Sequence, residues 1–267
     1  MTQDVFDCHK AYGILSEYHD SLDIRLNDIE SYLCPAMVDA VGRVLGRGHK
    51  NLAVLADILM CLYLSDIAHE KIKDGGWESD GMPSRQYSVL VGDYWLSESF
   101  WQMISHQIFA QISLRHFTGL VKTMKEGALL RWKMAQNLIG REGLPTIWEM
   151  ERGALMALSG KLAAEILGAD GSAVTLFERF GRYLGLAWAA GEEVAGAADG
   201  VKSSGGVSEI SPLWAVFLAE AKALIGELAC FGNVTALEEV LDFLEKELNF
   251  RAKSPMSADL NSGTPTP

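Results

Sequence analysis

Residues 180–194, FGRYLGLAWAAGEEV, join apolar and small residues at helical spacing to two adjacent acids. The small residues, among them Gly181 and Gly185, let a neighbouring helix or a ligand come close to the backbone. Glu192 and Glu193 at the end of the run fit two interpretations. They are either ligands of a metal ion inside a helical bundle or a solvated helix end before a Gly-rich loop. The pair alone leaves both interpretations open.

The rest of the chain indicates helices rather than a sheet. The sequence shows no sustained alternation with a period of two, and the helix formers Ala, Leu, Glu and Met dominate it. Apolar spacing predicts helices over residues 53–72, 87–117 (one long helix or a pair), 120–138, 144–166, 176–194, 213–228 and 236–248. Clusters of Gly, Ser and Asp predict loops over residues 74–84, 168–172 and 198–206. We therefore predict one all-α domain over residues 1–252 and a disordered tail over 253–267.

The composition of the chain excludes several classes of protein. With 267 residues, 49 % of them hydrophobic, the chain can bury a sizeable core and is not intrinsically disordered. The formal net charge of −12 argues against a nucleic-acid footprint and disfavours binding to an anionic membrane surface. No uninterrupted apolar run reaches about 18 residues, so we expect no membrane span.

The cysteines and the first residues bear on location. The four cysteines, Cys8, Cys34, Cys61 and Cys230, lie far apart and show no CxxC spacing. This pattern is typical of reduced, structural cysteines. The N-terminal sequence MTQDVFDCHK carries acids early and lacks the apolar core of a signal peptide. We therefore expect a cytoplasmic location.

Three stretches occur in an order that resembles a known enzyme family. They are VLVGDYWLSESF (89–100), with Gly-Asp-Tyr at 92–94, ERGALMALSGKLAAEILGAD (151–170) and FGRYLGLAWAAGEEV (180–194). Together they resemble the trans-polyprenyl diphosphate synthases of the isoprenoid synthase fold. The resemblance implies a helical bundle around a central cavity in which isopentenyl diphosphate attacks an ionised allylic diphosphate. In such a reaction a divalent metal stabilises the departing diphosphate.

The resemblance also implies two Asp-Asp-x-x-Asp motifs that face each other across the cavity and hold Mg²⁺. The first falls on Asp66 and Glu70, with an apolar residue at the middle position. The second falls on Glu192 and Glu193, and its third position is Gly196. We therefore expect Asp66, Glu70, Glu192 and Glu193 to be a vestigial metal site. Mg²⁺ is implied only if the chain is active or if a catalytic partner supplies the ion.

The basic residues that would bind diphosphate are also altered. The Lys-Thr pair of the family falls on Glu151 and Arg152, and its Arg-Pro element falls on Cys34 and Pro35. The family's Arg-Arg-Gly is absent from KIKDGGWE, residues 71–78. The resemblance therefore keeps the scaffold while most of the residues that carry the chemistry are replaced.

Two further expectations concern surfaces. The segment 87–117 is apolar widely enough to face another chain, so we predict that Phe100 and Ile104 lie in an interface between chains. The basic residues Arg131, Lys133 and Arg141 are predicted to form a solvated face.

These observations lead to one functional hypothesis and two alternatives. The leading hypothesis is a noncatalytic, regulatory subunit of a heterodimeric trans-polyprenyl diphosphate synthase, which assists chain elongation by a catalytic partner. One alternative is a divergent, active Mg²⁺-dependent prenyltransferase. The other is a non-enzymatic protein that binds isoprenoids or lipids. The sequence leaves open whether the chain forms a homodimer or pairs with a catalytic subunit, and whether it binds a prenyl diphosphate.

Overall fold

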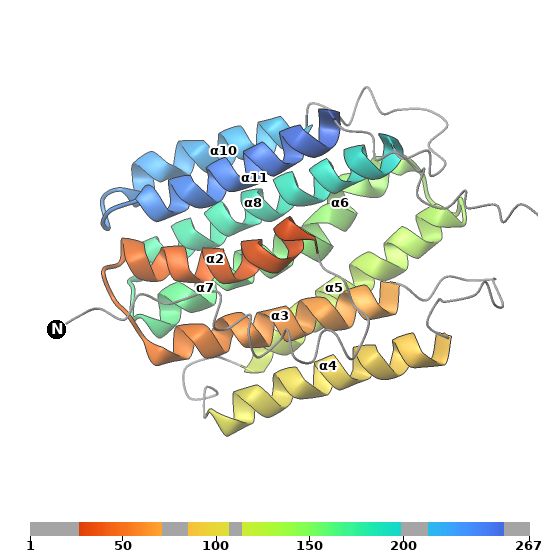
Figure 1. Ribbon diagram of the computed structural model, residues 1–267, viewed down its shortest axis with the longest axis horizontal. Coiled ribbons are helices and arrows are strands. Elements are labelled where there is room, and N and C mark those ends of the chain that lie inside the picture. Colours follow the sequence, from red (N-terminus) through yellow and green to blue (C-terminus); the bar gives the residue numbers. More distant parts are fainter. Residues whose placement is uncertain (1–26, 71–84, 107–113, 199–212, 254–267) are drawn as a thin grey trace, which may run out of the picture.

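A computed structural model of the chain describes residues 27–70, 85–106, 114–198 and 213–253 (Figure 1). No β-strand occurs within these four ranges, which confirms the all-α prediction. The α-helices are α2 (Asp28–Val44), α3 (Lys50–Glu70), α4 (Arg85–Ser105), α5 (Leu114–Ala135), α6 (Leu144–Trp148), α7 (Ala154–Ile166), α8 (Gly171–Ala198), α10 (Leu213–Leu228) and α11 (Thr235–Lys253).

Local sequence signals determine where two of the helices begin and end. The backbone N–H of Glu30 donates to the side chain of Asn27 at 3.1 Å, and the N–H of Asn27 donates to the Glu30 carboxylate at 2.7 Å. This capping box begins α2. Gly168, with φ 66°, ends α7 in the left-handed region that glycine tolerates best.

Helix α8 is the central element of the bundle. It packs against α7 on one side and against α10 and α11 on the other, while α4 lies at the edge of the described bundle, mainly against α3 (Figure 1). Small residues allow the close approach, because a Cβ on Gly181 would overlap the backbone carbonyl of Met156. The same holds for Gly185 and the carbonyl of Arg152. The glycines in the stretch 180–194 therefore bring α8 directly onto the segment that carries Arg152.

That segment departs from the sequence prediction. The predicted continuous helix over 144–166 is interrupted by η3, a π-helical turn over Glu149–Gly153 between α6 and α7. A π-helical turn inserts one residue into the helical repeat and so rotates the side chains that follow it. Glu151 and Arg152 lie inside this turn, and both are buried.

Other predicted boundaries were close to the observed ones. The segment 87–117 is a pair of helices, since α4 ends at Ser105 and α5 begins at Leu114. Helix α10 has its predicted bounds, and α3 begins three residues earlier than 53. Helix α8 begins five residues earlier than 176, inside the predicted loop over 168–172. Residues 254–267, and the predicted loops over 74–84 and most of 198–206, lie outside the described residues. The predicted division into one domain and a tail stays a prediction.

Helix α3 is long and apolar enough, by length and composition alone, to cross a membrane. However, 78 % of the apolar window is buried inside the bundle. Such burial is expected of the core helix of a helical bundle.

We predict that Gly181→Ala lowers the free energy of unfolding by about 1–3 kcal/mol, because the added methyl group forces α8 away from Met156. Chemical denaturation followed by circular dichroism measures the change. Gly226→Ala in α10 is the matched control, since nothing lies within 4 Å of the added Cβ. That variant should be neutral or gain up to about 1 kcal/mol from helix propensity. Equal effects of the two substitutions would contradict the close packing of α8.

Candidate functional site

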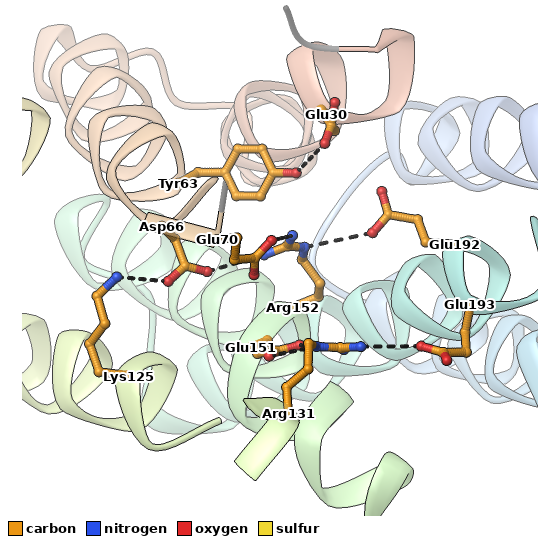
Figure 2. Close-up of polar contacts among 10 residues, drawn as sticks. All are labelled: Glu30, Tyr63, Asp66, Glu70, Lys125, Arg131, Glu151, Arg152, Glu192 and Glu193. Carbon is orange, nitrogen blue, oxygen red and sulfur yellow. Dashed lines mark hydrogen bonds and ion pairs between the residues drawn. The ribbon is translucent and has the colours of Figure 1, made fainter. Parts of the chain in front are cut away.

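The two predicted carboxylate positions meet at the guanidinium group of Arg152. This group lies 3.4 Å from Asp66 Oδ2, 3.8 Å from Glu70 Oε2 and 3.9 Å from Glu192 Oε2. Figure 2 shows the arginine reaching from the π-helical turn into the space between α3, which carries Asp66 and Glu70, and α8, which carries Glu192. Its side chain is only 8 % exposed. A fixed cation therefore lies among three of the four residues predicted to be metal ligands.

Two aromatic rings hold the guanidinium group in place. Arg152 Cζ lies 4.6 Å from the ring centroid of Tyr63 and 5.1 Å from that of Trp188. These are cation–π distances, and the planar guanidinium suits such contacts better than an ammonium group does. The hydroxyl of Tyr63 donates to Glu30 Oε1 at 2.9 Å, which ties the ring to the start of α2.

Asp66 carries a second cationic partner. Lys125 Nζ of α5 lies 3.0 Å from Asp66 Oδ1 and 3.2 Å from His69 Nδ1. The other ring nitrogen of His69 lies 3.4 Å from Asp93 Oδ1 of α4. Lys125 faces one oxygen of Asp66 and Arg152 faces the other, while the Asp66 side chain is only 1 % exposed to water. The Gly-Asp-Tyr sequence of α4 thus has a structural role, in which Asp93 contacts His69.

Glu193 belongs to a separate ion-pair cluster. Arg131 of α5 donates to both carboxylate oxygens of the buried Glu151, with distances of 2.6 to 3.1 Å, and to Glu193 Oε2 at 3.2 Å. Arg141 Nη2 lies 3.9 Å from Glu193 Oε1. Arg131, predicted to lie on a solvated basic face, is half-buried and engaged in ion pairs with Glu151 and Glu193. Adjacent in sequence, Glu192 and Glu193 point to different arginines (Figure 2).

The arrangement does not fit Mg²⁺. Each of Asp66, Glu70, Glu192 and Glu193 has an arginine or lysine within 4 Å. A divalent cation among them would lie beside the guanidinium group of Arg152, and the two like charges would repel each other. Within the part of the chain that the structure describes, no three Asp, Glu, His or Cys side chains form a group able to hold a metal ion.

The ionisation of the centre follows from its burial. Burial raises the pKa of Glu70 to about 7, and the nearby Asp66 and Glu151 add to the shift while Arg152 opposes it. Burial also raises the pKa of Glu192 against the attraction of Arg152. Burial alone would lower the pKa of Arg152, but the facing Tyr63 and acidic residues raise it well above its ordinary value. Arg152 is therefore permanently charged, and its attraction opposes the rise that burial causes in the pKa values of Glu70 and Glu192.

The position that would correspond to the family's diphosphate-binding arginine is apolar. Cys34 is buried, its Sγ lies 3.3 Å from Ser159 Oγ, and burial raises the pKa of its thiol to about 12. A neutral thiol in this place offers no charge to a diphosphate.

The cations that pair with the four carboxylates were not predicted from the sequence. Arg152 was identified as a replaced diphosphate contact but not as the centre of the site, and Lys125 was not considered. One signal was available, since an isolated arginine between the apolar segments 144–148 and 154–158 is costly to bury without acidic partners. That signal does not identify the partners, because they come from α3 and α8.

Comparisons with known proteins show the fold. No family model and no curated protein matches the sequence. Among solved structures, heptaprenyl diphosphate synthase from Staphylococcus aureus is similar with a TM-score of 0.68 and 10 % identity, covering 92 % of this chain and 99 % of the other. A polyprenyl synthase from Caulobacter crescentus CB15, complexed with calcium and isoprenyl diphosphate, is similar with a TM-score of 0.67 and 18 % identity. The match covers 95 % of this chain and 91 % of the other. A geranyltranstransferase from Methanosarcina mazei is similar with a TM-score of 0.66 and 16 % identity, and the match covers 90 % of this chain and 96 % of the other.

These similarities confirm the predicted fold. The described helices form the isoprenoid synthase fold of the trans-polyprenyl diphosphate synthases, over nearly the full length of the similar chains. At these identities the likeness extends to the fold and leaves the activity to be inferred from the site.

The raised pKa of Glu70 predicts a pH dependence of stability. A glutamate in the unfolded chain titrates near 4.5, whereas Glu70 in the folded chain titrates near 7. Between these values the folded state binds more protons than the unfolded state, so stability falls as the pH rises from about 5 to 7. Glu70→Gln should flatten this dependence when Tm is measured in steps of pH.

Asp57→Asn is the comparison variant for this measurement. Burial raises the pKa of Asp57 to about 6, so most of its contribution to the slope falls at lower pH than that of Glu70. Between about pH 6.5 and 7.5 the Glu70 variant should therefore change the slope of Tm against pH more than the Asp57 variant does. A Glu70→Gln protein with the wild-type slope in this window would contradict the account of the polar centre.

Proposed function

We propose that the chain is a noncatalytic subunit of a heterodimeric trans-polyprenyl diphosphate synthase. The observation that carries the proposal is the position of Arg152 among Asp66, Glu70 and Glu192. In the family that the chain resembles, these positions are those of the Mg²⁺ ligands. Here a side chain of the protein supplies the positive charge.

The electrostatics of the site argue against diphosphate chemistry in this chain. Departure of diphosphate requires a cation that can approach the leaving group and move with it. The cationic side chains of the centre are instead paired with carboxylates, Lys125 with Asp66 and Arg131 with Glu151. Glu151 also places a negative charge at the position of the family's lysine. A diphosphate entering this centre would meet carboxylates and, among the drawn residues, no cation that is not already paired with one of them (Figure 2).

An exposed apolar face on α4 supports the role of a subunit. Leu90, Trp101 and Ile104 are 68 %, 65 % and 58 % exposed, and Tyr94 is 40 % exposed. Their spacings of four, seven and three residues place them along one side of the helix. The opposite side of α4 packs on α3, and α4 lies at the edge of the described bundle (Figure 1). An exposed apolar stripe of this kind, interrupted on this side of the helix by Ser97, is typical of a surface that another chain covers.

The two residues predicted to lie in an interface are one helical turn apart on α4 and differ in exposure. Ile104 belongs to the exposed stripe. Phe100 is half-buried, and its ring packs edge to face against Phe117 of α5 at a centroid distance of 5.4 Å. An interface on α4 would therefore use Ile104 and Trp101 directly, while Phe100 supports the helix from inside.

The proposed partner is a catalytic polyprenyl diphosphate synthase subunit, which supplies the Mg²⁺ site and binds the allylic and isopentenyl diphosphates. This chain completes the helical interface and assists elongation of the product. A cytoplasmic location is part of the proposal.

The first test is activity alone and with a partner. The purified chain, incubated with Mg²⁺, isopentenyl diphosphate and an allylic diphosphate, should give no product. Co-purification from the native host should recover a synthase subunit whose activity or product length changes when this chain is added. Turnover by the chain alone would support the divergent prenyltransferase instead. Metal-free binding of a prenyl compound without a synthase partner would support a lipid-binding protein.

The second test concerns the α4 stripe. Ile104→Asp places a charge in the apolar stripe, so it should abolish assembly and leave the helical content unchanged. Leu129→Asp on α5 is the control, because Leu129 is 51 % exposed but lies outside the stripe. Sedimentation and circular dichroism measure both properties. Assembly that survives Ile104→Asp, or fails equally with Leu129→Asp, would rule out this surface. A complex formed by the chain with itself would make it a homodimer.

A further inference from the structure

The polar centre contains a cation that cannot dissociate. Arg152 is covalently part of the π-helical turn, its side chain is 8 % exposed, and its guanidinium group contacts carboxylates from both α3 and α8. The contact distances of 3.4 to 3.9 Å are those of ion pairs around a shared charge and are too long for strong individual hydrogen bonds. The guanidinium group therefore acts on these carboxylates through its charge.

We propose that Arg152 is a built-in counter-ion that replaces a divalent cation between α3 and α8. It makes the bundle complete without metal. The inference rests on the proposed function, because it takes the centre to be noncatalytic. It adds that the charge of Arg152 is what holds the carboxylates together. A bound metal gathers carboxylates from two helices and cancels their repulsion, and Arg152 does the same here.

Three observations support this role. First, Asp66 is 1 % exposed and could not be accommodated as an anion without adjacent cations. Second, the Nε atom of Arg152 is buried without a hydrogen-bond partner, so the group is not held by a complete set of directional bonds. Third, the rings of Tyr63 and Trp188 flank the guanidinium group and exclude other occupants from its faces.

The proposal predicts a difference in metal response between the wild type and Arg152→Met. The wild type should have the same Tm in EDTA and in millimolar MgCl₂ or MnCl₂. Methionine has a similar length and no charge, so Arg152→Met leaves Glu70 and Glu192 without their cationic partner and Asp66 with Lys125 alone. Its Tm in EDTA should fall by roughly 10 °C. Part of this loss should be recovered on adding Mg²⁺ or Mn²⁺, because the freed carboxylates then gain an exchangeable counter-ion.

Two further variants isolate the charge effect. Arg43→Met removes an exposed arginine that also lies between two carboxylates, Asp39 at 3.9 Å and Glu239 at 2.9 Å. It should cost little stability and show no metal response. Adding Glu192→Gln to Arg152→Met removes one uncompensated carboxylate, so the double variant should be more stable than Arg152→Met and respond less to metal.

Several outcomes would overturn the proposal. They are a wild type whose Tm rises with Mg²⁺, an Arg152→Met protein as stable as the wild type, and a destabilised Arg152→Met protein that metal does not help. The last would show that Arg152 acts through packing on Tyr63 and Trp188.

If Arg152→Met does not fold, Arg152→Lys distinguishes a role of the charge from a role of packing, because lysine keeps the charge and loses the planar contacts. A folded, metal-insensitive lysine variant supports the proposal, and failure of both variants overturns it. None of these measurements needs a partner chain or substrate. A failed co-purification therefore tests the proposed function and leaves this inference standing.

Discussion

The buried charge of Arg152 is the constraint on which the rest of the polar centre depends. Removing a guanidinium group from water is costly, and the cost is offset only where acidic groups and polarisable surfaces surround it. Here α3 supplies Asp66 and Glu70, α8 supplies Glu192, and two aromatic rings cover the faces. These contacts link the positions of α3, η3 and α8 through one side chain.

Under the proposed function, the same constraint explains how the scaffold keeps its shape without a metal ion at its centre. Carboxylates that face each other across a bundle repel unless a cation lies between them, whether that cation is a metal ion or an arginine. An exchangeable metal ion can engage a diphosphate, but a tethered guanidinium already paired with three carboxylates cannot move to do so. The fold of the polyprenyl diphosphate synthases is therefore retained here with its central charges internally satisfied. In the proposed role of a noncatalytic subunit, the functional surface is the exposed apolar stripe of α4.

The helices could be predicted from the sequence because apolar periodicity is a local property. The segment around Asp66 and the helix that carries the two glutamates were located closely for this reason. The π-helical turn over Glu149–Gly153 was not predicted, since it is defined by packing against α8 and has no distinctive residue pattern. The separate partners of Glu192 and Glu193 could not be predicted either. Residues adjacent in a helix point about 100° apart, and only the tertiary structure shows which arginine lies in each direction.

The most direct measurement is a crystal structure of the wild-type chain soaked in Mn²⁺, with the anomalous scattering of manganese used to locate the ion. The account predicts no anomalous peak within coordination distance of Asp66, Glu70 or Glu192, and a guanidinium group of Arg152 in ordered density between them. A manganese ion bound to these carboxylates, with Arg152 displaced toward solvent, would contradict it.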